Sequence, residues 1–173
     1  EVAANNSTTD IDVAVAKINF GTTAITIDWI NQYANSLYSM LNSSISIDEF
    51  NEIYITCGLR SKADNTTRDS WWIGKIDTTG AIIWNYRYVA PGRELTMAAT
   101  SAIDIFGDLN IAFTRIDNTN TLTTIDTVKI GYDGKIKNHT TNQSTANKIE
   151  GLTVHSIDVD NSGDVHAVGQ TQW

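Results

Sequence analysis

Three segments of this chain are copies of one another at a constant spacing. Residues 45–58, 101–114 and 157–170 align without a gap, and their shared aspartates, Asp48, Asp104 and Asp160, each lie 56 residues from the next. A constant period of this length is typical of a repeat architecture, in which each unit buries its apolar face against its neighbours. The sequence therefore predicts a series of similar units.

Each copy has the pattern of a β-hairpin. Apolar and polar side chains alternate along residues 53–57 and again along 165–169, and this period of two is typical of strands. Asn51, Gly107 and Gly163 occupy one register position between two such runs. A tight hairpin turn needs a residue there that tolerates a positive φ.

A second set of similar segments follows at nearly the same spacing. Residues 13–21, 70–80 and 127–134 each carry a lysine beside an apolar residue and end in a turn with glycine; the lysines are Lys17, Lys75 and Lys129. A further short strand comes next, at 24–31, 81–88 and 135–140. Each unit therefore holds four strands.

One stretch carries apolar residues at helical offsets. Leu37, Met40 and Leu41 have this spacing within residues 31–44. The stretch nevertheless occupies the place of a loop and a strand entry in the other units, so we predict no helix. Pro91 and Gly92 stand in the matching loop of the second unit, which also favours an all-β fold.

The complete pattern is Asp-x-x-Gly or Asn, an acidic residue, an apolar strand, a Lys-Ile strand with a glycine turn, and an apolar strand with Trp. It resembles the bacterial β-propeller repeat family of surface and secreted proteins over nearly the whole chain. The resemblance implies an all-β, β-propeller-like fold with three four-stranded units of about 56 residues. It implies little about activity, because propellers host many functions. The chain departs from the family pattern at Asn51, which replaces Gly, and at residues 113–115, which end the second hairpin.

The family pattern also implies which strand is innermost, namely the one that contains the repeated Asp. On this order we expect a half blade at 11–31, blades at 44–88 and 100–140, and a half blade at 152–173 within a single repeat domain. Propellers close with about four to eight blades, so three units leave an open strand edge that invites pairing. Its partner is either a further part of a longer chain or another copy, joined head to tail in a ring or a filament. A different all-β fold is the remaining alternative.

The composition excludes some partners. A formal charge of −8, spread without an acidic run, would repel nucleic acid and anionic membrane surfaces. The apolar stretches are far shorter than the roughly 20 residues that span a bilayer, so we expect no membrane insertion. Cys57 is the only cysteine, which rules out an internal disulfide and favours a small buried apolar residue over a reactive thiol.

Several asparagines stand in Asn-x-Ser/Thr triplets within Ser-, Thr- and Asn-rich stretches that predict loops: Asn5, Asn6, Asn42, Asn65, Asn138 and Asn142. In a secreted chain such sites carry glycan, although chance produces many of these triplets in this composition. The chain begins at Glu1 without Met, which we interpret as a processed product. We expect an extracellular or cell-surface location.

One loop has the beginnings of a calcium site. Asp158, Asp160, Ser162 and Asp164 place oxygen ligands at alternate positions, but Gly169 stands where the bidentate acid is expected. The alternative interpretation is a hairpin turn with Asx-type hydrogen bonds. Calcium apart, no cofactor is expected.

No pattern indicates catalysis. His139, His155 and His166 lack the spacing of a metal pair, and the sequence has no nucleophile elbow or phosphate loop. We therefore expect a protein that is not an enzyme.

The tryptophans are the best candidates for contacts with a ligand or partner: Trp29, Trp71, Trp72, Trp84 and Trp173. Trp29 and Trp84 are expected to pack between blades. Trp71 and Trp72 are adjacent, so they point to opposite faces of a strand, and we expect one of them to be exposed. Trp71, Trp72 and Trp173 are the predicted contact residues.

The pattern is compatible with three functions. The first is a non-enzymatic structural or interaction protein that assembles through its blades, with copies of itself or further blades as partners. The second is a lectin-like propeller that binds glycans through exposed Trp and Tyr. The third is a fragment of a propeller hydrolase.

Overall fold

The computed structural model describes residues 11–65, 67–68, 70–89, 94–116, 123–143 and 153–170. Predictions that concern Asn5, Asn6 and Trp173 lie outside these ranges. The described residues form twelve strands and no helix, which confirms the all-β prediction. The strands are β1 (Val13–Phe20), β2 (Ile25–Tyr33), β3 (Tyr38–Ile47), β4 (Ile53–Ser61), β5 (Ser70–Ile76), β6 (Ile82–Val89), β7 (Glu94–Ile103), β8 (Leu109–Ile116), β9 (Thr123–Ile130), β10 (Ile136–Gln143), β11 (Thr153–Val159) and β12 (Val165–Gln170).

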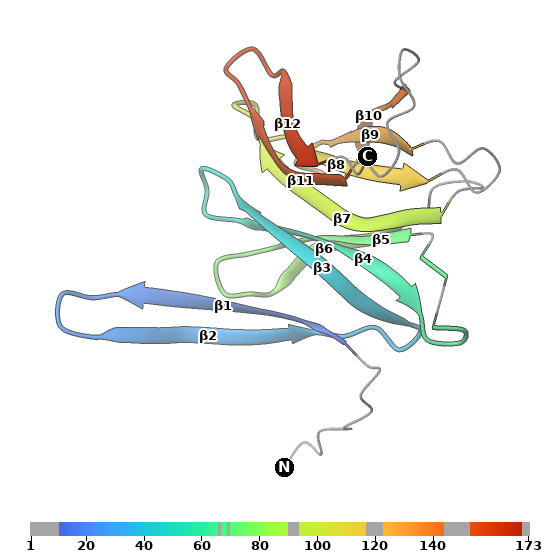
Figure 1. Cartoon of the computed structure of the whole chain (residues 1–173). Coiled ribbons are helices and arrows are strands. Elements are labelled where there is room, and N and C mark those ends of the chain that lie inside the picture. The colour runs from blue at the N-terminus through green and yellow to red at the C-terminus, as the bar shows by residue number, and fades with distance from the viewer. Residues whose placement is uncertain are drawn as a thin grey trace.

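The strands form four antiparallel sheets in chain order (Figure 1). Two sheets are four-stranded meanders, β3-β4-β5-β6 and β7-β8-β9-β10, and the hairpins β1-β2 and β11-β12 are two-stranded sheets on either side of them. The first four-stranded sheet begins at Tyr38, earlier than residue 44, because β3 continues past a register shift between Leu41 and Ser44. Within the described residues the four sheets do not close into a ring.

The repeated aspartates form the same turn three times. Oδ1 of Asp48 accepts hydrogen bonds from the amides two and four residues later, at 3.0 and 2.8 Å. Asp104 and Asp160 do the same in their turns. The fourth residue of each turn has a positive φ, 62° at Asn51, 75° at Gly107 and 86° at Gly163, which confirms the turn prediction.

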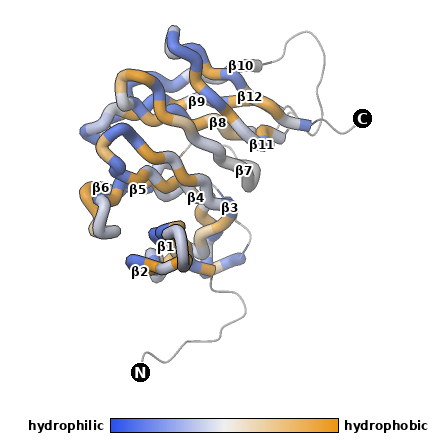
Figure 2. The backbone as a smooth tube through the Cα atoms, turned by 90° about the vertical axis from the view of Figure 1, so that its left-hand side faces the viewer, coloured by the Kyte–Doolittle hydropathy of each residue, from blue (hydrophilic) through white to orange (hydrophobic). Residues whose placement is uncertain are grey.

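The sheets stack on one another (Figure 2), and each junction buries a cluster of apolar side chains. β1-β2 packs on β3-β6 through Val13, Val15 and Tyr33, and β3-β6 packs on β7-β10 through Tyr54, Trp71 and Ile73. The first strands of successive sheets lie side by side, and Ser44 and Ser101 join β3 to β7 with their hydroxyls 3.1 Å apart.

The prediction that one of Trp71 and Trp72 is exposed is wrong. Their relative exposures are 2% and 7%. The two rings do point to opposite faces of β5, but both faces of this sheet are covered. Trp71 packs against the following sheet near Phe113, whereas Trp72 packs against the preceding one near Tyr33.

Trp29 and Trp84 join neighbouring sheets. Trp29 Nε1–H donates to the carbonyl of Thr78 in the β5-β6 turn, at 3.0 Å, and Trp84 Nε1–H donates to the carbonyl of Tyr132 in the β9-β10 turn, at 3.1 Å. One contact is therefore used at two successive junctions. The β1-β2 hairpin sits on its neighbour as a complete sheet does.

Candidate functional site

In each hairpin at the two ends, one strand lacks the second neighbour that its copies have in the complete sheets, among the described residues. In the complete sheets the second strand pairs with the third, as β4 with β5 and β8 with β9. β12 is the copy of β4 and β8, but it pairs only with β11. β1 carries the lysine of the third strand, and it pairs only with β2. β12 is thus a second strand without a third, and β1 is a third strand without a second, so each edge could pair with the other.

Apolar residues that are buried in the complete sheets are exposed on these hairpins. Ile76 and Ile130, which follow the shared lysine, are 0% exposed, whereas Ile18 at the same position of β1 is 47% exposed. On β12, Val168 is 63% exposed, although Thr56 and Ala112, at the same position of the repeat, are buried. Further exposed apolar residues of the β1-β2 hairpin are Phe20, Ile25, Ile27 and Ile30.

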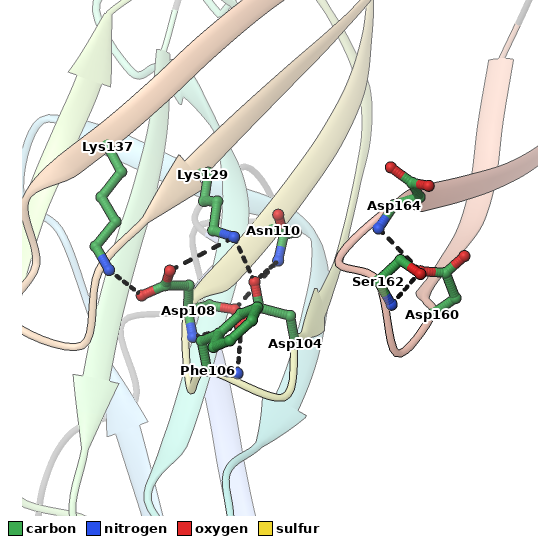
Figure 3. Close-up of polar contacts among 9 residues, drawn as sticks. All are labelled: Asp104, Phe106, Asp108, Asn110, Lys129, Lys137, Asp160, Ser162 and Asp164. Carbon is green, nitrogen blue, oxygen red and sulfur yellow. Dashed lines mark hydrogen bonds and ion pairs between the residues drawn. The ribbon is translucent and has the colours of Figure 1, made fainter.

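A buried ion-pair cluster ties the first turn of each complete sheet to its third strand. In β3-β6, Lys75 Nζ lies 3.5 Å from Asp48 Oδ2 and 2.5 Å from Glu52 Oε2. In β7-β10, Lys129 Nζ lies 2.6 Å from Asp104 Oδ2 and 3.5 Å from Asp108 Oδ2 (Figure 3). The turn aspartate thus uses Oδ1 for its own turn and Oδ2 for the lysine.

The second cluster shows how these charges are balanced. Asn110 Nδ2 also donates to Asp104 Oδ2, at 3.2 Å, and Lys137 Nζ lies 2.7 Å from Asp108 Oδ1. Burial alone would raise the pKa of Asp104, but the hydrogen bond from Lys129, backbone amides and Asn110 together hold it below its usual value. The bond to Asp104 in turn raises the pKa of Lys129.

The same cluster is divided between the two ends of the described chain. The acids of the third copy, Asp160 and Asp164, stand in the β11-β12 turn (Figure 3). Asp160 Oδ2 there contacts His166 Nε2 at 3.0 Å, and no lysine among the described residues pairs with it. The matching lysine, Lys17, lies on β1, is about half exposed and is 3.3 Å from Asp28.

A hollow lies beside the open edge of β1. Its volume is about 200 Å³, and it is lined by β1, the middle of β3 and Ile55 of β4. The β3 residues that line it are Ser43, Ser44 and Ile45. In the complete sheets, first and second strands occupy the corresponding place. Two further strands added at the edge of β1 would lie beside this hollow.

The stretch that carries the predicted calcium ligands forms the β11-β12 hairpin turn. Asp160 Oδ1 accepts the amides of Ser162 and Asp164, and Asp158 Oδ1 accepts the amide of Val159. No group of three or more His, Cys, Asp or Glu side chains in the described ranges is placed to hold a metal. The geometry is that of the alternative interpretation, an Asx-type hairpin turn.

The glycosylation candidates fall in different settings. Asn42 and Asn65 are exposed and have positive φ values of 48° and 56°. Asn138 is exposed on β10, and Asn142 is on the same strand. Exposure is compatible with glycosylation, which stays a prediction.

A series of polar side-chain contacts connects β6 with β9 and β10, and the sequence did not indicate it. Tyr88 Oη lies 3.2 Å from His139 Nδ1, and His139 Nε2 lies 2.8 Å from the buried Asp126 Oδ2. Thr141 also donates to Asp126, at 3.3 Å. The histidine thus joins neighbouring sheets. No signal of spacing links these residues, because they come from three strands.

No protein-family model matches this chain, and none of the curated proteins matches it either. None of the described residues forms a helix that could cross a membrane.

Proposed function

We propose that this protein is a non-enzymatic structural module that assembles through β-propeller blades at its open strand edges. The observation that carries the proposal is the pair of complementary half sheets, β1-β2 and β11-β12. Each hairpin packs on the neighbouring four-stranded sheet as a complete sheet does. Its strand β1 or β12, however, presents unpaired backbone groups. Such an edge is a template for pairing with another strand.

The stacking supports propeller-like geometry. Successive antiparallel sheets contact one another along their first strands, β3 with β7 and β7 with β11. Propeller blades are arranged in this way around a central axis. An extracellular or cell-surface role is part of the proposal. It depends on the resemblance of the repeat and on exposed triplets such as the one at Asn65.

Light scattering after size exclusion tests the assembly. The wild-type chain should have a mass above the 19.0 kDa of one copy. Val168→Lys places a charge on the exposed face of β12 and should give a monomer, because the charge would be buried without a partner in a joined sheet. Ile83→Lys, at a comparably exposed residue on the outer strand β6, is the matched control and should assemble normally. A folded wild-type monomer at every concentration would falsify the proposal.

The carbohydrate-binding hypothesis loses two of its residues. Stacking on a sugar needs an accessible aromatic face, whereas the rings of Trp71 and Trp72 are buried between sheets. Their role in this chain is to hold three layers together.

A further inference from the structure

The repeat determines how β12 and β1 would align. In the first complete sheet, Tyr54 lies opposite Lys75 and Ile55 opposite Gly74; in the second, Asn110 lies opposite Lys129. His166 has the repeat position of Tyr54 and Asn110, and Lys17 has that of Lys75 and Lys129. The same pairing therefore places His166 opposite Lys17 and Ala167 opposite Ala16. The register therefore follows from this chain's own two complete sheets.

This alignment would restore the divided ion-pair cluster. Lys17 would reach the Asp160 and Asp164 turn as Lys129 reaches Asp104 and Asp108. His166 would keep its contact with Asp160, in the way that Asn110 shares Asp104 with Lys129.

The alignment would also bury the exposed apolar positions. Ile18 would face the sheet that precedes the joined one, as Ile76 and Ile130 do, both of which are 0% exposed. Val168 would face the sheet that follows. β12 and β11 would extend the sheet from the edge of β1 and cover the hollow beside it, whose lining includes Ser44 and Ile45. Charge and packing thus favour the same occupant, a second β11-β12 hairpin.

The number of copies follows from the strand count. The described residues of one copy contribute two complete sheets and two half sheets. Two copies joined head to tail at both ends would make six four-stranded sheets, within the range of about four to eight in which propellers close. One copy would make three sheets and three copies would make nine, both outside that range.

We propose that two copies of this chain close into a six-bladed ring, in which β12 of each copy pairs with β1 of the other and Lys17 joins the partner's Asp160 and Asp164. This inference rests on the proposed function and adds to it the partner, the register and the size of the assembly. A head-to-tail contact gives a closed particle only when the rotation closes, and otherwise a filament.

Charge reversal tests the ring. In Lys17→Glu, the introduced carboxylate would face the partner's Asp160 and Asp164 at both contacts between the copies. In Asp164→Lys, the introduced lysine would face the partner's Lys17 at both contacts. Juxtaposed like charges of this kind should raise the dissociation constant of each variant by on the order of 100-fold. Both native side chains are exposed, so circular dichroism should show the wild-type fold. Lys135→Glu, on an exposed turn pair with Asp133, is the control and should assemble as the wild type does.

Mixing the two variants in equal amounts gives the decisive measurement. In a heterodimer, one contact is the native Lys17–Asp164 pair and the other is its swapped form, so assembly should return. The particle should have a mass of about 38 kDa, twice the 19.0 kDa of one chain. The double variant Lys17→Glu/Asp164→Lys should also recover, because both of its contacts are swapped.

The outcomes separate the two proposals. If the wild type is monomeric, both proposals fail. If it assembles but the single variants assemble equally well, or the mixture does not recover, assembly stands and this pairing is wrong. If the mixture recovers as a series of growing masses, the edges pair but the ring does not close, which overturns the six-bladed particle.

Discussion

Lysine occupies one register position on three strands, but its surroundings differ. Lys75 is buried among Asp48, Glu52 and the ring of Tyr54, whose centroid is 4.8 Å from Nζ. Lys17 is about half exposed and forms its ion pair with Asp28. The same residue type therefore makes different contributions to the stability of an isolated chain.

Replacing Lys75 with Met should lower the free energy of unfolding by about 3–5 kcal/mol, because Asp48 would be left buried without its cation. Lys17→Met should lower it by at most about 1 kcal/mol, as exposed ion pairs contribute little. Urea unfolding measures the free energy of unfolding of both variants. The Val168→Lys substitution is included in each so that assembly does not contribute to the measured value. Equal losses would show that the Lys75 cluster is not a stabilising unit.

The Asp104 cluster should make stability depend on pH in acid. The folded pKa of Asp104 lies below its usual value of 3.8, so its contribution is complete above that value and is lost as the pH falls through the folded pKa. The free energy of unfolding should therefore decline as the pH falls below about 4. In Lys129→Met the pKa of Asp104 should rise and this decline should become shallower.

Carboxyl NMR titration and unfolding measured at each pH follow these two quantities. Lys135→Met, which removes a cation from an exposed turn, should leave the Asp104 titration in place. An Asp104 pKa that does not move in Lys129→Met would contradict the role given to this lysine.

At the scale of strands and hairpins, the constant period located much of the fold. Asp48, Asp104 and Asp160 marked three hairpin turns whose positive-φ residues the structure confirms, and the lysine segments marked the third strands. The start of β3 was missed. A register shift interrupts its alternation at 41–44, where Asn42 has a positive φ, and a period of two cannot be followed through such a bulge.

The sequence was less informative about burial and contacts between strands. Alternation distinguishes the two faces of β5, but it does not show that both are covered, so the exposure of Trp71 or Trp72 was wrongly predicted. The sequence showed the repeated acids and the repeated lysines as two separate sets of aligned positions. Their meeting within one sheet depends on strand order, which the spacing alone does not specify.

The register proposed for β12 and β1 predicts a specific cross-link. In Ala16→Cys/Ala167→Cys the two new thiols would lie directly opposite each other between copies, within the Cα separations that disulfides accept. Oxidation should give a covalent dimer. Ala16→Cys/Val168→Cys is the control, because residue 168 points to the other face, and it should cross-link weakly.

Cys57 does not complicate this measurement. The residue is fully buried, and its burial raises the pKa of the thiol to about 12, so it should stay reduced and unreactive in the folded chain. Efficient cross-linking of the Val168→Cys control, with little from Ala167→Cys, would indicate a register shifted by one residue.

At the scale of the whole molecule, each sheet contacts only its neighbours, so stability should be distributed unevenly along the stack. The central strands β4, β5 and β8 carry most of the buried residues, whereas β12 is mostly exposed. A two-stranded hairpin is marginally stable without further packing. The two half sheets should therefore open locally while the central sheets remain closed.

Hydrogen exchange should show that the half sheets open more readily than the central sheets, and that assembly removes this difference. In the monomeric Lys17→Glu variant, amides of β1 and β12 should exchange at least about 10-fold faster than in the wild-type assembly, since each added 1.4 kcal/mol of local stability slows exchange about tenfold. Amides of β4 and β8 should be protected in both. Protection that rises on β12 but not on β1 would mean that the two edges do not pair with each other, because a head-to-tail ring must cover both at once.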